Sequence, residues 1–192
     1  LVPIGATAIY PLPLYSKKHK SVADIPQGGT IVVPDDPTNL SRALLVLYSA
    51  GLVKFKVEQN PFVTPADIDT AASKVTVKTV DANQTALSLD SVDGAVVNND
   101  FVAKSGLTSK ELLAQDDPAD ASAFPYINIF AAKAEDAENP TYLKLVKIYQ
   151  DTTAVQDGVL AASGGTAVLV KTPVADLLTS LKDTEDDIRA NQ

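Results

Sequence analysis

Short apolar runs alternate with amphipathic segments along most of this chain. Compact apolar runs bounded by glycine, proline or polar residues are typical of strands, whereas apolar residues three and four positions apart are typical of helices. The runs predict strands or extended segments at residues 5–14, 30–33, 74–80, 94–97, 126–132 and 166–170. Helical spacing predicts helices or helical turns at residues 21–25, 40–47, 83–92, 140–149, 152–162 and 173–189. This alternation indicates a layered α/β architecture.

The most informative stretch is VPDDPTNLSRALLVL, from Val33 to Leu47. It leads from a buried strand through a proline-rich turn into a helix, for which Thr38 or Asn39 is a suitable N-cap. Arg42 then lies in the first turn of the helix, close to free backbone N–H groups and the positive end of the helix dipole. A carboxylate there would also meet a guanidinium fork that binds both of its oxygens. The stretch therefore predicts a small-anion site, and the alternative is that Arg42 is solvated or pairs with a nearby carboxylate such as Asp35 or Asp36.

Asn98 directly follows the apolar run at residues 94–97. Open α/β sheets bind ligands at the carboxyl ends of their strands, which is where this side chain is expected. Its amide is both donor and acceptor, so Asn98 is able to bind the ammonium or the carboxylate of an amino acid. The alternative is a simple turn residue. Arg42 also follows the end of a strand, and the two residues together indicate a ligand site more strongly than either alone.

Composition and charge narrow the class of protein. The chain has 192 residues, of which 45% are hydrophobic and 21% are charged, as in ordinary globular proteins. A net charge of −8 without a dense basic block argues against nucleic acid as a partner. The absence of cysteine excludes disulfides, thiolate metal sites and cysteine nucleophiles. No run approaches the roughly 18 consecutive apolar residues of a membrane-spanning helix.

No catalytic or metal-binding constellation is visible in the sequence. The single histidine, His19, lies in a basic turn, where histidines are usually solvated. The paired acids at residues 35–36, 116–117 and 186–187 lack the spacing of a calcium loop, and are expected to be caps, turn formers and solvated side chains. The glycine pairs at 28–29 and 164–165 lack the spacing of phosphate-binding loops. We therefore expect no enzyme, no metal site and no cofactor.

Four segments resemble the methionine-binding lipoproteins of the MetQ/NlpA type, in the order and spacing of that family. They are YSKKHKSVADIP at Tyr15–Pro26, PDDPTNLSRALLVLYSAGLVK at Pro34–Lys54, LDSVDGAVVNNDFVAKSGL at Leu89–Leu107 and FPYIN at Phe124–Asn128. The resemblance covers roughly residues 1–150 and fades after residue 151. It implies a two-lobed α/β fold of the periplasmic-binding-protein class (type II), with the ligand in the cleft and closure by hinge bending.

The resemblance also implies roles for individual residues. Arg42 corresponds to the arginine that meets the α-carboxylate of the ligand, and Asn98 to an asparagine that holds its amino-acid head group. Asn39 belongs to the same motif as Arg42 and is expected to line the cleft, with a plain helix cap as the alternative. The chain departs from the family at residues 84–87, which lack a Pro-Arg pair, and at Phe101, where the family has tyrosine. These departures bear on methionine as the ligand more than on ligand binding itself.

The resemblance predicts how the two lobes divide the chain. Residues 14–113 are expected to form one lobe, and residues 1–13 with 114–192 the other, with hinge crossings near 12–16 and 114–124. The family has a preceding segment that builds the first half of the first lobe and supplies aromatic residues around the ligand side chain. We therefore expect a longer natural protein, in which residues 1–13 and 114–192 are part of that lobe and have an apolar sheet edge to cover.

The function implied by the resemblance is transport. We expect an extracytoplasmic substrate-binding protein, held to the bacterial cell membrane through an upstream lipid anchor, that captures methionine as a monomer. It would deliver the amino acid to the permease of an ABC importer. The alternatives are the same fold with another ligand, such as a dipeptide, and the effector-binding domain of a transcription regulator.

Overall fold

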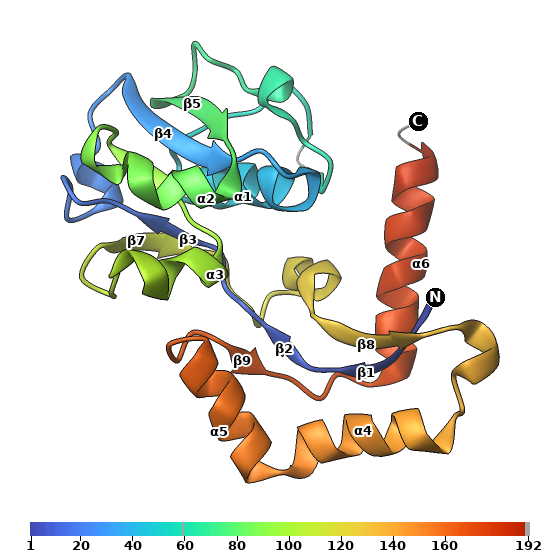
Figure 1. Cartoon of the computed structure of the whole chain (residues 1–192). Coiled ribbons are helices and arrows are strands. Elements are labelled where there is room, and N and C mark those ends of the chain that lie inside the picture. The colour runs from blue at the N-terminus through green and yellow to red at the C-terminus, as the bar shows by residue number, and fades with distance from the viewer. Residues whose placement is uncertain (59, 191–192) are drawn as a thin grey trace. The chain divides into compact units, whose positions relative to one another are not determined.

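The computed structural model describes residues 1–58 and 60–190, which form two compact units (Figure 1). Unit 1 comprises Leu1–Pro11 and Asp117–Gln192, and unit 2 is the continuous segment Leu12–Asp116. The sequence placed the two boundaries after residues 13 and 113, within three residues of these division points. The hinge role of the two crossings stays a prediction.

Unit 2 is built on a five-stranded sheet in the order β5-β4-β6-β3-β7. The strands are β3 (Pro13–Tyr15), β4 (Gly29–Pro34), β5 (Val75–Val80), β6 (Gly94–Val96) and β7 (Leu112–Gln115). β4 is parallel to both β5 and β6, whereas β3 is antiparallel to β6 and to β7. The strand predicted at residues 94–97 is β6, which lies between β4 and β3 in this sheet. It is central, but it is parallel to β4 only, because β3 enters the sheet in the opposite direction.

Both faces of this sheet are covered, which explains why β4 reads as a continuous apolar run. Ile31 and Val33 point into one core together with Leu44 and Leu47 of α1 (Pro37–Ser49). The intervening Val32 points into a second core on the opposite face, beneath α2 (Ala82–Thr85), the 3-10 helix η3 (Ala86–Asp90) and α3 (Asn99–Val102). The predicted helix at 83–92 is therefore divided between α2 and η3.

The end of α1 agrees with the sequence. Gly51 has a φ of 72° and directly follows the C-cap residue Ala50, so it is the left-handed residue expected after a helix. The predicted turn at residues 21–25 is the 3-10 helix η1 (Val22–Asp24). The aromatic ring of Phe55, beyond the helix, stacks on Tyr48 at 5.3 Å between ring centroids. The stacking of Phe55 on Tyr48 holds the C-terminal end of α1 against the rest of unit 2.

A cluster around Asp93 joins the amino-terminal ends of β4 and β6. Asp93 Oδ1 lies 2.9 Å from His19 Nε2, and Oδ2 accepts a hydrogen bond from the Thr30 N–H at 2.8 Å. Ser16 completes the cluster, because its hydroxyl donates to the Asp93 carbonyl oxygen at 2.6 Å and accepts from the His19 N–H. The hydrogen bond with His19, joined by the one from Thr30, lowers the pKa of the Asp93 carboxyl below its ordinary value. His19, expected to be solvated, is therefore a structural residue.

The lowered pKa makes the stability of unit 2 depend on pH. A carboxyl whose pKa is lower in the folded state adds stability above its unfolded pKa of about 3.9, and this is lost as pH falls through the folded value. We expect Asp93→Asn to lower the free energy of unfolding at neutral pH, with the difference from wild type shrinking below about pH 4. Urea unfolding across this range measures it, with exposed Asp100→Asn as the control. A difference that stayed constant with pH would contradict the assignment.

The described residues of unit 1 contain two short antiparallel strand pairs and three α-helices. β1 (Val2–Ala6) pairs with β8 (Ile129–Ala132), and β2 (Ala8–Ile9) pairs with β9 (Val168–Leu169). The helices are α4 (Pro140–Asp151), α5 (Thr153–Ala162) and α6 (Val174–Ala190). The predicted crossing near residues 114–124 includes the end of β7 and the first part of the 3-10 helix η5 (Ala121–Tyr126), which also takes Tyr126 from the strand predicted at 126–132.

The helices of unit 1 bury only part of their apolar side chains. Gly5 of β1 lies so close to α4 that an added Cβ would come within 2.3 Å of Val146, and α6 packs against β1 (Figure 1). The apolar residues of α6 are only partly covered, since Leu177 is buried but Leu178 is 42% exposed. Within residues 1–58 and 60–190, no helix combines the length and apolar character needed to cross a bilayer.

Candidate functional site

The carboxyl ends of several strands meet at one edge of the unit 2 sheet. β4 and β6 are parallel neighbours, with Val32 beside Ala95, and β7 runs in the same direction because both β6 and β7 are antiparallel to β3. Asp36 follows β4, Asn98 follows β6 and Asp116 follows β7. These three residues and Arg42 of α1 are called the polar edge below. Both chain crossings also lie there, because β3 begins and β7 ends at this edge.

Arg42 is buried and forms an ion pair with a partner that the sequence did not predict. Its residue exposure is 7%, and its Nε and Nη2 atoms lie 2.7 and 2.6 Å from Asp116 Oδ2. The other oxygen, Asp116 Oδ1, accepts the Leu12 N–H at 2.6 Å. Arg42 lies in the second turn of α1 and not in the first, because the helix begins at Pro37. The carboxylate beside it comes from Asp116, 74 residues away, and not from the adjacent turn.

Asp36 is the N-cap of α1. Its Oδ1 accepts two hydrogen bonds of 3.0 Å from Asn39, one from the backbone N–H and one from the side-chain Nδ2. The prediction that Thr38 or Asn39 caps the helix is therefore wrong. An aspartate followed by proline at the first helical position is a strong start signal, and it pointed to Asp36. Asn39 instead fixes the orientation of the Asp36 carboxylate.

Two buried oxygens at the polar edge have no hydrogen-bond partner within the part of the chain that the structure describes. They are Asp36 Oδ2 and Asn98 Oδ1, and no other buried side-chain nitrogen or oxygen in residues 1–58 and 60–190 shares this state. Asn98 is the N-cap residue of α3, yet its side chain makes no capping hydrogen bond. A buried acceptor without a donor costs about 1–3 kcal/mol, so such atoms call for an explanation. Both acceptors follow neighbouring strands, and a ligand with N–H donors would satisfy them.

The sequence found part of this edge and missed part of it. Arg42 and Asn98 were named because each follows an apolar strand, and Asn39 because it shares the motif of Arg42. Asp116 was interpreted as a turn or solvated residue because its partners are distant in sequence. The only signal that pointed to Asp116 was that a buried arginine is usually paired with a carboxylate.

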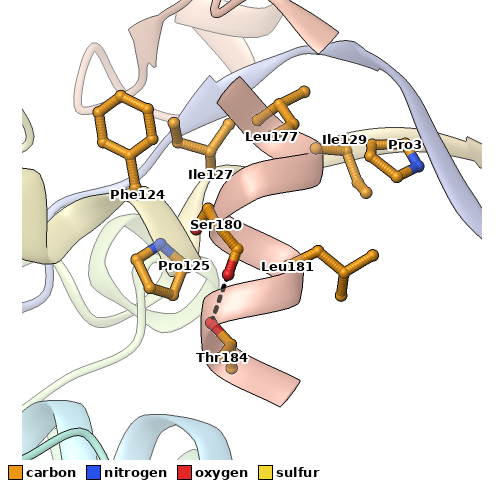
Figure 2. A pocket seen from close by; sticks show the side chains of 9 residues that line it. All are labelled: Pro3, Phe124, Pro125, Ile127, Ile129, Leu177, Ser180, Leu181 and Thr184. Atoms are coloured by element: carbon orange, nitrogen blue, oxygen red, sulfur yellow. Dashed lines mark hydrogen bonds between the residues drawn. The ribbon is translucent and has the colours of Figure 1, made fainter. Parts of the chain in front are cut away.

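The remaining chemistry of unit 1 differs from that of the polar edge. An apolar groove of about 150 Å³ lies between η5, the β1–β8 pair and α6 (Figure 2). None of the nine residues that line it is charged, and the Thr184 hydroxyl donates to the Ser180 carbonyl oxygen at 2.8 Å. In the described residues, no group of three or more histidine, cysteine or acidic side chains is arranged to hold a metal ion. This groove therefore offers no charged group to a charged small molecule.

The model of the NlpA lipoprotein family matches residues 1–169. This chain belongs to that family. The match confirms the family indicated by the four sequence segments, and it includes every residue of the polar edge. For this NlpA family member, the match also covers the whole segment from Pro34 to Lys54.

Solved structures of other proteins share the fold of this NlpA family member. Protein PG110 from Staphylococcus aureus matches with a TM-score of 0.82 at 32% identity, covering 94% of this chain and 72% of that chain. A nutrient binding protein from Burkholderia cenocepacia, whose structure is bound to methionine, matches with a TM-score of 0.74 at 35% identity, covering 88% and 69%. The predicted two-lobed α/β fold of the periplasmic-binding-protein class is confirmed.

Sequence relatives of this NlpA family member are longer than the chain. The "probable D-methionine-binding lipoprotein MetQ" of Haemophilus influenzae is 38% identical over 159 residues, which are 82% of this chain and 56% of that protein. The chain therefore spans little more than half the length of this relative.

Proposed function

We propose that this chain is part of a substrate-binding protein that captures an amino acid, methionine, for an ABC importer. Membership of the NlpA family and the names of the relatives support a methionine-binding role. The observation that carries the proposal is the polar edge itself, which combines a buried guanidinium with two buried acceptors that have no hydrogen-bond partner among the described residues. A cation and two acceptors complement the two charged groups of an amino-acid zwitterion.

The proposed binding mode assigns each group of the amino acid to a residue. Arg42 binds the α-carboxylate through charge-assisted hydrogen bonds, which are among the stronger polar contacts in proteins. Asn98 Oδ1 accepts a hydrogen bond from the α-ammonium, and Asp36 Oδ2 supplies a second acceptor that is negatively charged. Asn39 acts indirectly, since its amide holds Asp36 in place.

The proposal extends to where the protein works. We place it outside the cytoplasm, anchored to the membrane by a lipid, and acting as a monomer that passes methionine to the permease. The family name and the lipoprotein names of the relatives support the anchor. Metabolic labelling of the protein in its host with a fatty-acid analogue tests this part, because an unlabelled, cytoplasmic protein would contradict it.

Calorimetric titration tests the ligand assignment. The protein is first freed of copurified ligand by partial unfolding and dialysis, and is then titrated with L-methionine, D-methionine, other amino acids and methionine-containing dipeptides. We expect methionine to bind with one site per chain. Binding of a dipeptide without binding of methionine would change the proposed ligand and leave the proposed site unchanged. No heat with any of these compounds would contradict the proposed function.

Asn98→Ala tests the acceptor at the end of β6. We expect the dissociation constant of methionine to rise roughly tenfold, because one hydrogen bond to a charged donor is lost. Asn83→Ala is the matched control, since Asn83 is an exposed asparagine of α2 in the same unit. Equal affinities of the two variants would remove Asn98 from the site.

A further inference from the structure

We propose that Asp116 is a positioning residue that holds Arg42 in the orientation required for the ligand carboxylate. The inference rests on the proposed function for its ligand, but its structural basis is independent of it. Asp116 Oδ2 receives both Nε and Nη2 of Arg42, at 2.7 and 2.6 Å. Because two donors of one planar group are directed at the same oxygen, the plane and the rotation of the guanidinium are fixed. A single contact would leave the guanidinium free to rotate.

The carboxylate is itself held in place. Asp116 Oδ1 accepts the Leu12 N–H at 2.6 Å, so both oxygens of Asp116 are engaged. The Arg42 side chain is 9% exposed and that of Asp116 is 21% exposed, and water therefore competes little for this pair. The arginine is thus preorganised, and a ligand carboxylate meets a guanidinium that has already lost its rotational freedom.

The same carboxylate connects Arg42 to the two ends of unit 2. Leu12 is the first residue of the unit and Asp116 is its last. The Asp116 side chain therefore contacts both Arg42 and the backbone of Leu12, where the chain enters the unit. The chain leaves the unit at Asp116 itself. We infer that Asp116 keeps the arginine at a fixed position relative to both crossings.

A different role for Asp116 makes the opposite prediction. If this carboxylate blocked Arg42, as an internal mimic of the ligand, its removal would strengthen the binding of methionine. If Asp116 positions Arg42, its removal weakens the recognition of the carboxylate specifically. The variant Asp116→Asn separates the two roles, because asparagine keeps an oxygen for the Leu12 N–H and loses the charge beside Arg42.

The first test does not depend on any ligand. Arg42 and Arg189 are the two arginines of the chain, so their Nε–H signals are readily assigned in an NMR spectrum of ¹⁵N-labelled protein. We expect the Arg42 Nε–H to exchange slowly with water in the wild type and roughly tenfold or more faster in Asp116→Asn, with Arg189 unchanged. Asp117→Asn is the control, because Asp117 is exposed and adjacent in sequence. An Arg42 signal that is the same in Asp116→Asn and in the wild type would overturn the inference.

The second test uses methionine and methioninol, which lacks the carboxylate. We expect Asp116→Asn to raise the dissociation constant of methionine roughly tenfold and to leave that of methioninol unchanged. A purely structural defect would weaken both ligands equally, and tighter binding of methionine would indicate the blocking role; either result overturns the inference. Asp116→Glu, which retains the charge, should restore part of the discrimination. Failure of the wild type to bind methionine would instead contradict the proposed function, and the NMR result would still decide the inference.

Discussion

Replacing Arg42 with alanine is expected to lower the affinity for methionine roughly a hundredfold or more. The substitution removes a buried cation that the proposed mode pairs with the ligand carboxylate, and hydrogen bonds to charged groups contribute about 1.5–3 kcal/mol each. Two such bonds exceed the roughly 2.8 kcal/mol that a hundredfold change in affinity represents. Calorimetric titration of the variant with methionine measures the effect.

Arg189→Ala is the matched control, because Arg189 is exposed near the end of α6, where it pairs with Glu185 and Asp186. Arg42→Ala also leaves Asp116 without its cation, and breaking a buried ion pair from one side is usually destabilising. The double variant Arg42→Ala/Asp116→Ala removes both charges and separates loss of binding from loss of folding. Methionine affinity in folded Arg42→Ala equal to that of Arg189→Ala would exclude the proposed role of Arg42.

The second large effect is on stability. Leu44 is fully buried where α1 packs on the sheet, together with Ile31 and Val33. We expect Leu44→Ala to lower the free energy of unfolding of unit 2 by about 2–5 kcal/mol, since the helix cannot close the cavity that the truncation leaves. Urea unfolding followed by circular dichroism measures the change.

Leu87→Ala provides the control for this prediction, because Leu87 belongs to the same unit but is 69% exposed. The two variants lose the same atoms from different environments. A difference between them below about 0.5 kcal/mol would show that the packing of α1 contributes little to stability. Since α1 carries Arg42 and is capped by Asp36, such a result would also weaken the structural basis of the polar edge.

The sequence predicted those parts of the fold that local pattern determines. The strand at residues 30–33 and the helix after it follow from apolar runs, helical spacing and the glycine at position 51. Whether a strand is parallel to both neighbours is a property of the whole sheet, and so the antiparallel entry of β3 beside β6 was not predicted. The expected helix at 83–92 shows the same limit, since spacing identified an apolar face but not the change from α2 to the 3-10 geometry of η3.

For the candidate site too, the sequence predicted the residues that local pattern identifies and missed those that depend on distant contacts. Arg42 and Asn98 were identified from their positions after strands, and their ligand roles stay predictions. Asp116 contacts Arg42, which lies 74 residues away in sequence. The short polar stretch that contains Asp116, before a proline, has no local feature that indicates such a contact. Asp36 was named only within a pair of capping, turn-forming or solvated acids, because Thr38 and Asn39 are equally good capping residues and the proline at position 37 was not used to decide among them.

The structure of the protein in complex with methionine tests the central claim most directly. The account predicts the ligand carboxylate within hydrogen-bonding distance of the Arg42 guanidinium. It also predicts the ammonium at Asn98 Oδ1 and Asp36 Oδ2, with the Arg42–Asp116 pair retained. Methionine bound elsewhere, or bound with Arg42 and Asn98 both out of contact with it, would contradict the account.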